Sequence, residues 1–299
     1  MKSVVIILAL IMMQLNVNAQ IDPGKVEEGD VYECIRMGDH VFLNGRDYRI
    51  SFLRDEIQFS VESLNYYLRA AQRNSFVAHI KIGFCYLFLT SRPNISISQL
   101  KDSEDAFLKA LSLSNNLTEG DLRWLGESSR KQDYLRAAYY GLACCYWRKG
   151  EYSMSEQYLL KTIQSCSEIS HVEVMIDALR LMGYWYAQKQ DYKAAVGCFS
   201  TIIRLGKDPG FPEFDTEVRF RLGVNLYMDG AKEKAYDILR NNSKWQEMHS
   251  HYNSFWNERK GDFSNRVRDG VFEIMKSWTI CKVNDISYTR LWNYYMCGF

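Results

Sequence analysis

The sequence predicts an all-α protein, an α-solenoid of stacked helical hairpins with a helical C-terminal cap. Only 4 prolines occur in 299 residues, and proline interrupts helix interiors. Three segments align at a constant spacing of 40 residues, and a fixed period of this size is typical of repeats that cover one another. Apolar residues make up 47% and aromatic residues 14% of the chain, which supplies a core and excludes a disordered chain.

Residues 1–19 are predicted to be a cleaved signal peptide. Lys2 precedes an apolar run, residues 4–13, and the small-residue ending at residues 17–19 suits cleavage at that point. The apolar run is about half of what a membrane-spanning helix needs, so an uncleaved anchor is the less favoured alternative. The Asn-Ala-Gln sequence at the cleavage point resembles signal peptides of exported Bacteroidetes proteins. We therefore expect export, to a periplasm or to the exterior.

The charge balance excludes two classes of partner. The chain has 37 basic and 36 acidic residues, and removal of Lys2 with the signal leaves 36 of each. A chain with no basic excess is a poor nucleic-acid binder, and it has no polybasic block for anionic lipids. No later segment holds 18 uninterrupted apolar residues, so no membrane span is expected after signal removal.

Helical hairpins are expected from residue 20 to residue 242, and the earliest are the weakest. A first helix is expected over residues 31–43 and a second around residues 63–70. The next unit has the element Gly83-Phe84-Cys85-Tyr86, then a loop at residues 90–98, then a helix that contains Phe107 and Ala110.

The best repeats lie in residues 136–242. Three copies of one pattern occupy residues 142–152, 182–192 and 222–232. In each copy a large apolar residue precedes a small one, Tyr or Leu follows three positions later, and a polar turn comes next: KGEY, KQDY or DGAK. On a helix this pattern gives one apolar stripe, with a gap at the position of the small residue that we call the notch. The notch lets a second helix approach closely, and Phe or Leu from that helix fills the space.

These residues resemble the tetratricopeptide repeat family. The match is best at Met182-Gly183, Tyr186, Asp191-Tyr192, Ala195 and Phe199. In the copy at residue 142, Ala143 stands where the family prefers Gly, and Ser155 where it prefers Ala. The period also exceeds the family's usual length of about 34 residues. The resemblance implies stacked two-helix units and a binding function.

Residues 243–299 do not continue the repeat. Gly261-Asp262-Phe263 interrupts it, an amphipathic helix is expected over residues 264–282, and the end is rich in aromatic residues such as Trp292 and Tyr295. A solenoid must cover its exposed end, so we expect a capping segment; a docking element for a partner is the alternative.

The cysteines favour buried thiols. There is no CxxC motif, and most of the 8 cysteines lie within apolar helical patterns, where a thiol behaves as a small hydrophobe. Cys281 and Cys297 flank a turn-like stretch and are the best disulfide candidates.

No catalytic, cofactor or metal motif is found. The sequence lacks GxSxG, HExxH, P-loop and GxGxxG patterns. His249 and His251 are two residues apart, a spacing that diverges on a helix, and surface histidines are the simpler interpretation. We therefore expect a protein that is not an enzyme and needs no cofactor or metal.

The first helices of the hairpins should line a concave groove with the stripe opposite the notch. Its expected members are Tyr140, Trp147, Arg148, Arg180, Tyr184, Phe220 and Tyr227. Tyr, Trp and Arg carry most binding energy in interfaces, so a groove for an extended or helical peptide is one hypothesis. The alternative is that tighter helix packing or the C-terminal segment fills the groove.

The sequence therefore predicts an exported protein-interaction scaffold with an unidentified protein or peptide partner. A structural subunit of an envelope complex with a self-occupied groove is the second hypothesis, and a helical hydrolase is the third and weakest.

Overall fold

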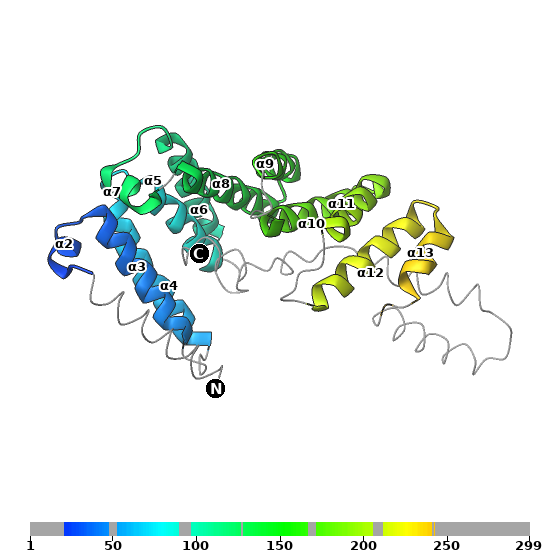
Figure 1. Ribbon diagram of the computed structural model, residues 1–299, viewed down its shortest axis with the longest axis horizontal. Coiled ribbons are helices and arrows are strands. Elements are labelled where there is room, and N and C mark those ends of the chain that lie inside the picture. The colour runs from blue at the N-terminus through cyan, green and yellow to red at the C-terminus, as the bar shows by residue number, and fades with distance from the viewer. Residues whose placement is uncertain are drawn as a thin grey trace. The chain divides into compact units, whose positions relative to one another are not determined.

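The computed structural model describes residues 21–47, 53–89, 97–126, 128–166, 172–205, 212–240 and 242. All regular structure in these residues is helical, with no β-strand, which confirms the all-α class (Figure 1). The signal segment, the expected cap at residues 243–299, the Cys281–Cys297 pair and His249 and His251 lie outside the described residues.

The chain divides into two compact units, with the boundary between Glu151 and Tyr152. The first unit contains α2 (Pro23–Glu27), α3 (Val31–Asp47), α4 (Leu53–Ala71), α5 (Phe76–Leu89), α6 (Ile97–Leu113), α7 (Glu119–Leu125) and α8 (Ser128–Lys149). The second contains α9 (Tyr152–Gln164), α10 (Val172–Gln188), α11 (Tyr192–Leu205), α12 (Pro212–Met228) and α13 (Lys232–Leu239). One continuous array over residues 20–242 stays a prediction.

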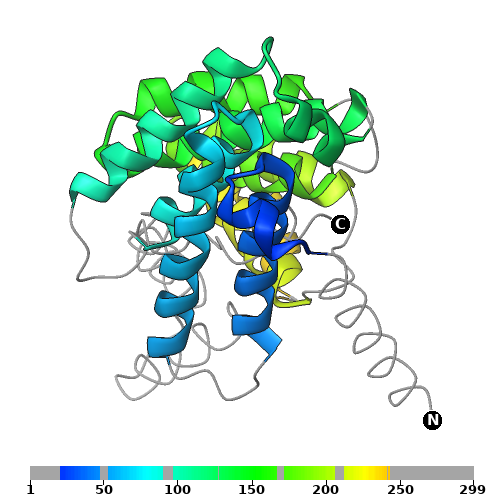
Figure 2. The same ribbon diagram turned by 90° about the vertical axis from the view of Figure 1, so that its left-hand side faces the viewer.

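In the first unit, helices that follow each other in the chain pack as pairs. Helix α3 packs against α4, and α5 packs against α6; Figure 2 shows α3 and α4, in two blues, side by side. Helix α4 also contacts α5, while α8 packs on α5 and α6, and the short α7 lies on α3. Helices α3 and α4 contain the predicted first pair and extend beyond it.

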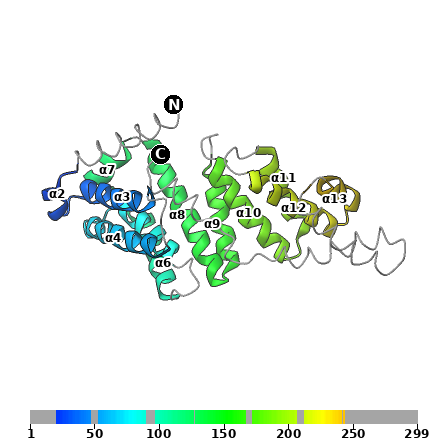
Figure 3. The same cartoon turned by 90° about the horizontal axis from the view of Figure 1, so that it is seen from below.

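In the second unit, each helix packs against the next one in the chain. This holds from α9 to α13, with the closest pairing between α10 and α11 and between α12 and α13. Figure 3 shows these helices following one another in chain order. Neighbour-on-neighbour packing of this kind is what helical hairpin repeats require.

The turns of the three best repeats share one backbone geometry at the predicted period. Gly150, Gln190 and Gly230 follow α8, α10 and α12, and their φ angles are +76°, +64° and +88°. After each of them, a backbone N–H donates to the carbonyl five residues earlier: Glu151 to Tyr146, Asp191 to Tyr186 and Ala231 to Leu226, all at 2.9 Å. These left-handed residues end the helices with a 6→1 bond, which confirms the turns predicted from KGEY, KQDY and DGAK.

The glycine notches also lie where the repeat predicts them. A Cβ at Gly183 would meet the Phe199 ring at 2.7 Å, and a Cβ at Gly223 would meet Leu239 at 2.4 Å. Each side chain comes from the second helix of the same pair and is fully buried. The first helix therefore approaches its partner closely only because the notch position has no side chain.

The first unit uses the same device in α5 and α8. A Cβ at Gly83 would lie 2.6 Å from Phe107, and one at Gly141 would lie 2.2 Å from the same ring. Phe107 of α6 therefore fits between two glycines. A third notch, Gly38 of α3 filled by Tyr67 of α4 at 2.4 Å, was not predicted.

Candidate functional site

The seven residues expected to line a groove lie on three first helices. They are Tyr140, Trp147 and Arg148 on α8, Arg180 and Tyr184 on α10, and Phe220 and Tyr227 on α12. All are buried except Arg148, which is half-buried. Six of the seven side chains are therefore packed, as in the alternative of tighter helix packing. Partner binding through these residues stays a prediction.

The arginines of this stripe contact groups of their own chain. Arg148 donates to the Leu87 carbonyl at 3.1 Å. Arg180 pairs with Asp177 one turn earlier at 3.5 Å. A buried guanidinium needs such compensation because its desolvation is costly. The guanidinium groups of Arg148 and Arg180, which were expected to bind a partner, therefore contact groups within their own units.

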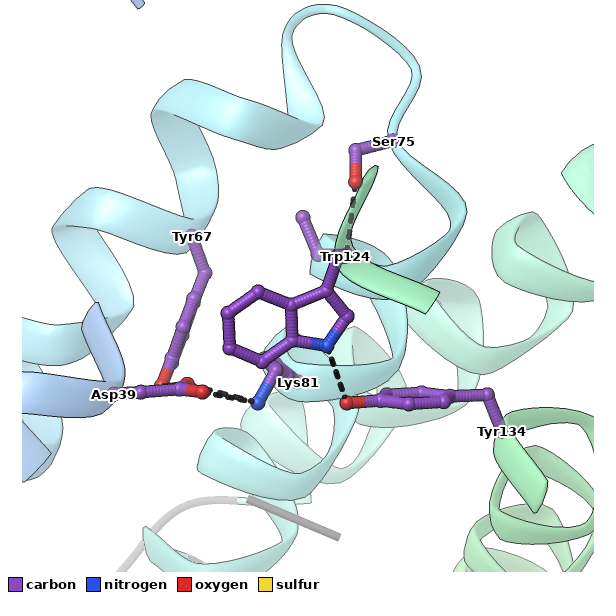
Figure 4. A network of polar contacts seen from close by, with 7 residues as sticks. Asp39, Tyr67, Ser75, Lys81, Trp124 and Tyr134 are labelled. Carbon is purple, nitrogen blue, oxygen red and sulfur yellow. Dashed lines mark hydrogen bonds and ion pairs between the residues drawn. The ribbon is translucent and has the colours of Figure 1, made fainter. Parts of the chain in front are cut away.

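A buried ion pair links helices of the first unit (Figure 4). Lys81 of α5 has a side chain that is 0% exposed, and its Nζ lies 2.8 and 2.9 Å from the two carboxylate oxygens of Asp39 on α3. The Tyr67 hydroxyl of α4 donates to the same carboxylate at 2.6 Å. One carboxylate therefore joins three helices.

Aromatic rings complete the surroundings of the Lys81 ammonium. Its Nζ lies 5.0 Å from the ring centroid of Trp124 on α7 and 5.7 Å from that of Tyr67, both within cation–π range. The Trp124 indole N–H donates to the Tyr134 hydroxyl of α8 at 2.8 Å, as Figure 4 shows. The ring above the ammonium is thereby fixed by a fourth and a fifth helix.

Asp121 fixes α7 on the start of α5. Its carboxylate accepts from the Ser75 hydroxyl at 2.6 Å and from the backbone N–H groups of Phe76 and Val77 at 3.1 Å each. It also closes a capping box with Thr118 at the start of α7. Unsatisfied N–H groups at a helix start favour a negative charge, so one fully buried aspartate stabilises two helix ends.

The contacts of this buried cluster favour a structural role. Burial raises the pKa of Asp39, and the Lys81 ammonium opposes that effect. Burial also raises the pKa of Tyr67, so its hydroxyl stays a donor. Because no part of the Lys81 side chain is exposed, its amine is out of reach of a substrate in this structure. The cluster holds five helices together.

Most of the described thiols are buried, as predicted. Cys34, Cys85, Cys144, Cys145 and Cys198 are buried, and Cys166 is half-buried. Burial raises the pKa of Cys145 and of Cys198 to about 12. Since the thiolate is the nucleophile, these two cysteines are inert at neutral pH.

The second unit carries a half-exposed group of polar and aromatic side chains, which we call the Glu156 cluster. It consists of Tyr152 and Glu156 on α9, Trp185 and Tyr186 in the last turn of α10, and Lys189 directly after that helix. The rings of Tyr152 and Trp185 stack at 4.6 Å and 25°. Large aromatic side chains that stay partly exposed beside a charge are typical of binding surfaces, so this cluster is the best described candidate.

Sequence reasoning missed the residues of both clusters. Lys81 had a signal: it is the one lysine in the largely apolar helix α5, and a buried charge requires a partner. Asp39 had none, because Lys81 and Tyr67 lie 42 and 28 positions away in the chain. The capping box with Thr118 is local, but the bond from Asp121 to Phe76 spans 45 positions and has no local signal. For the Glu156 cluster, the signal was two adjacent aromatic residues followed by a lysine one turn later.

In comparisons with known proteins, no family model and no curated sequence gives a match to this chain. Among the described helices, none has the length and apolar character needed to cross a bilayer. The same residues contain no group of three or more His, Cys, Asp or Glu side chains placed to hold a metal ion.

Proposed function

We propose that the chain is an exported interaction scaffold built of tetratricopeptide-like helical hairpins. One observation carries this proposal: the turn at residues 150, 190 and 230 repeats with the same backbone bond, and glycine notches are filled from the paired helix. Hairpins that stack in this manner form extended, rigid surfaces. Such surfaces bind proteins or peptides by preformed shape, without turnover.

The binding surface that we favour is the Glu156 cluster of the second unit. The expected inner stripe is packed, whereas Trp185, Tyr186 and Tyr152 are only half-buried and lie beside two charged groups. Aromatic anchors with a charged rim are typical of interface hot spots.

A second candidate is a structural subunit of an envelope complex whose inner face is occupied by its own chain. The burial of six of the seven stripe residues favours it. The two candidates differ in a simple respect: a scaffold captures a partner through exposed side chains, whereas a self-occupied subunit does not depend on them.

Export is part of the proposal. The mature protein is expected to begin at Gln20, after cleavage of residues 1–19. N-terminal sequencing of the protein purified from its native envelope would show this residue first, and retention of Met1 would contradict export by cleavage.

Partner capture tests the proposed function. A tagged mature chain is cross-linked in native envelopes and the bound proteins are identified by mass spectrometry. We expect a protein that the wild type captures and that Tyr152→Ala/Trp185→Ala loses. The control is Met154→Ala, an exposed change on α9. Equal circular dichroism and Tm would show that all three chains fold alike. A small-molecule turnover with no captured partner would contradict the scaffold.

A further inference from the structure

The Glu156 cluster has the geometry of a cation site. The Glu156 carboxylate accepts the Trp185 indole N–H at 3.0 Å through Oε2 and the Tyr186 hydroxyl at 2.8 Å through Oε1. These two bonds fix a negative charge beside two aromatic rings. A carboxylate has about four acceptor positions, so acceptor capacity remains for a further donor.

The site already has an occupant, and it is held loosely. The Nζ of Lys189 lies 5.1 Å from the Trp185 ring centroid and 5.8 Å from that of Tyr186. Its distance to Glu156 Oε2 is 3.8 Å, too long for a hydrogen bond, and its side chain is 45% exposed. An exposed ion pair of this kind contributes little, so another cation can replace it at small cost.

The side chains that surround the Lys189 ammonium are held in place by their neighbours. Tyr152 stacks on the Trp185 indole at 4.6 Å, which restrains the ring. Burial and the bond to Glu156 raise the pKa of Tyr186, so its hydroxyl stays protonated and keeps donating at neutral pH. The carboxylate and the two rings therefore keep their positions when Lys189 leaves.

We propose that Glu156, Trp185 and Tyr186 form a cage for a primary ammonium, and that a lysine side chain of a partner protein displaces Lys189 from it. The choice of lysine follows from the present occupant, which is itself a primary ammonium. Carboxylates and the faces of Trp and Tyr attract such ions. The partner part rests on the proposed function, but the cage can be tested without a partner.

The test uses n-butylammonium as a probe of the cage in the full mature chain. Tryptophan is labelled with ¹⁵N, and the Trp185 indole N–H signal is assigned with Trp185→Phe. In Lys189→Ala, which empties the cage, we expect a saturable shift of this signal. The wild type should bind the probe about two- to fivefold more weakly, since its own exposed ion pair competes. Neutral n-butanol, of matched length, should cause no saturable shift.

Glu156→Gln in the Lys189→Ala background should abolish the shift, because the amide keeps the shape and loses the charge. No saturable shift in Lys189→Ala and in Lys189→Gln, with folded spectra, would overturn the cage. Equal affinities of the wild type and Lys189→Ala would overturn the displacement. If the cage binds n-butylammonium but partner capture fails, the proposed function fails and the cage stands.

Discussion

At the scale of single residues, the backbone at Gln190 is the most informative position. It adopts φ +64°, whereas the equivalent turns place Gly150 and Gly230 in this region. Side chains other than glycine are strained there by roughly 1–2 kcal/mol. Gln190 therefore costs stability in an otherwise regular repeat.

Gln190→Gly is expected to stabilise the protein by about 0.5–1 kcal/mol. The measurement is the midpoint and slope of urea unfolding. Gly230→Gln is the matched control and should destabilise by a similar amount. A destabilised Gln190→Gly would mean that the Gln190 side chain makes a contact worth more than the strain.

Removal of the charge of Asp39 should be strongly destabilising. Asp39→Asn leaves the Lys81 ammonium buried without its counter-ion, and breaking a buried pair typically costs about 3–5 kcal/mol. Asp237→Asn is the control: its pair with Arg240 is exposed, at 3.7 Å, and should cost less than about 0.5 kcal/mol. Equal effects in urea unfolding would show that the buried pair adds no special stability.

His79 gives a pH dependence whose sign follows from its environment. Burial lowers the pKa of His79 below its ordinary value of 6.5. Between the folded pKa and 6.5 the unfolded chain binds more protons, so stability is lost as pH falls through this window. His40 shifts in the same direction, also through burial. His79→Gln should reduce the loss of Tm below pH 6.5 and leave the profile above it parallel to wild type; unchanged profiles on both sides would contradict this.

At the scale of helices, the notch glycines set how closely each pair packs. Gly183→Ala would place a Cβ 2.7 Å from the fully buried Phe199 ring, and overpacking of this kind costs about 1–3 kcal/mol. Phe199→Leu in the same chain should recover part of the loss. The measurement is urea unfolding of each single variant and of the double variant.

Gly197→Ala on α11 is the matched control for the notch. A Cβ there meets nothing within 4 Å, and Ala is favoured over Gly in an exposed helix by about 0.5–1 kcal/mol. The same substitution should therefore have opposite signs at residues 183 and 197. Loss of stability at both positions would contradict the notch as the cause.

The helices and the 40-residue spacing of the repeats could be predicted from the sequence because both depend on local patterns. The turn at 190 and the pair of Gly183 with Phe199 followed from a repeat within one short segment. The Asp39–Lys81 pair joins residues that are 42 positions apart, and no local pattern specifies such a contact. Arg180 was expected to bind a partner because arginine is common in interfaces. In the structure its charge is paired with Asp177, one turn earlier on the same helix.

At the scale of the whole molecule, both units pack helices through filled glycine notches, and the first unit adds a buried polar junction. The first has a polar junction that joins α3, α4, α5, α7 and α8 through Asp39, Lys81, Tyr67, Trp124 and Tyr134. The second relies on neighbour-on-neighbour helix packing with filled notches. Both arrangements fix the positions of neighbouring helices within a unit, and both suit a rigid binding surface.

Site-specific photocross-linking in native cells is the most direct test of the proposed scaffold. A benzoylphenylalanine is placed at Tyr152 in the Glu156 cluster and, as a reference, at exposed Tyr236 on α13. We expect a single dominant protein adduct from position 152, weakened by Glu156→Gln, and none of that mass from position 236. The same adducts from both positions, or no adduct from position 152 in a folded chain, would contradict it.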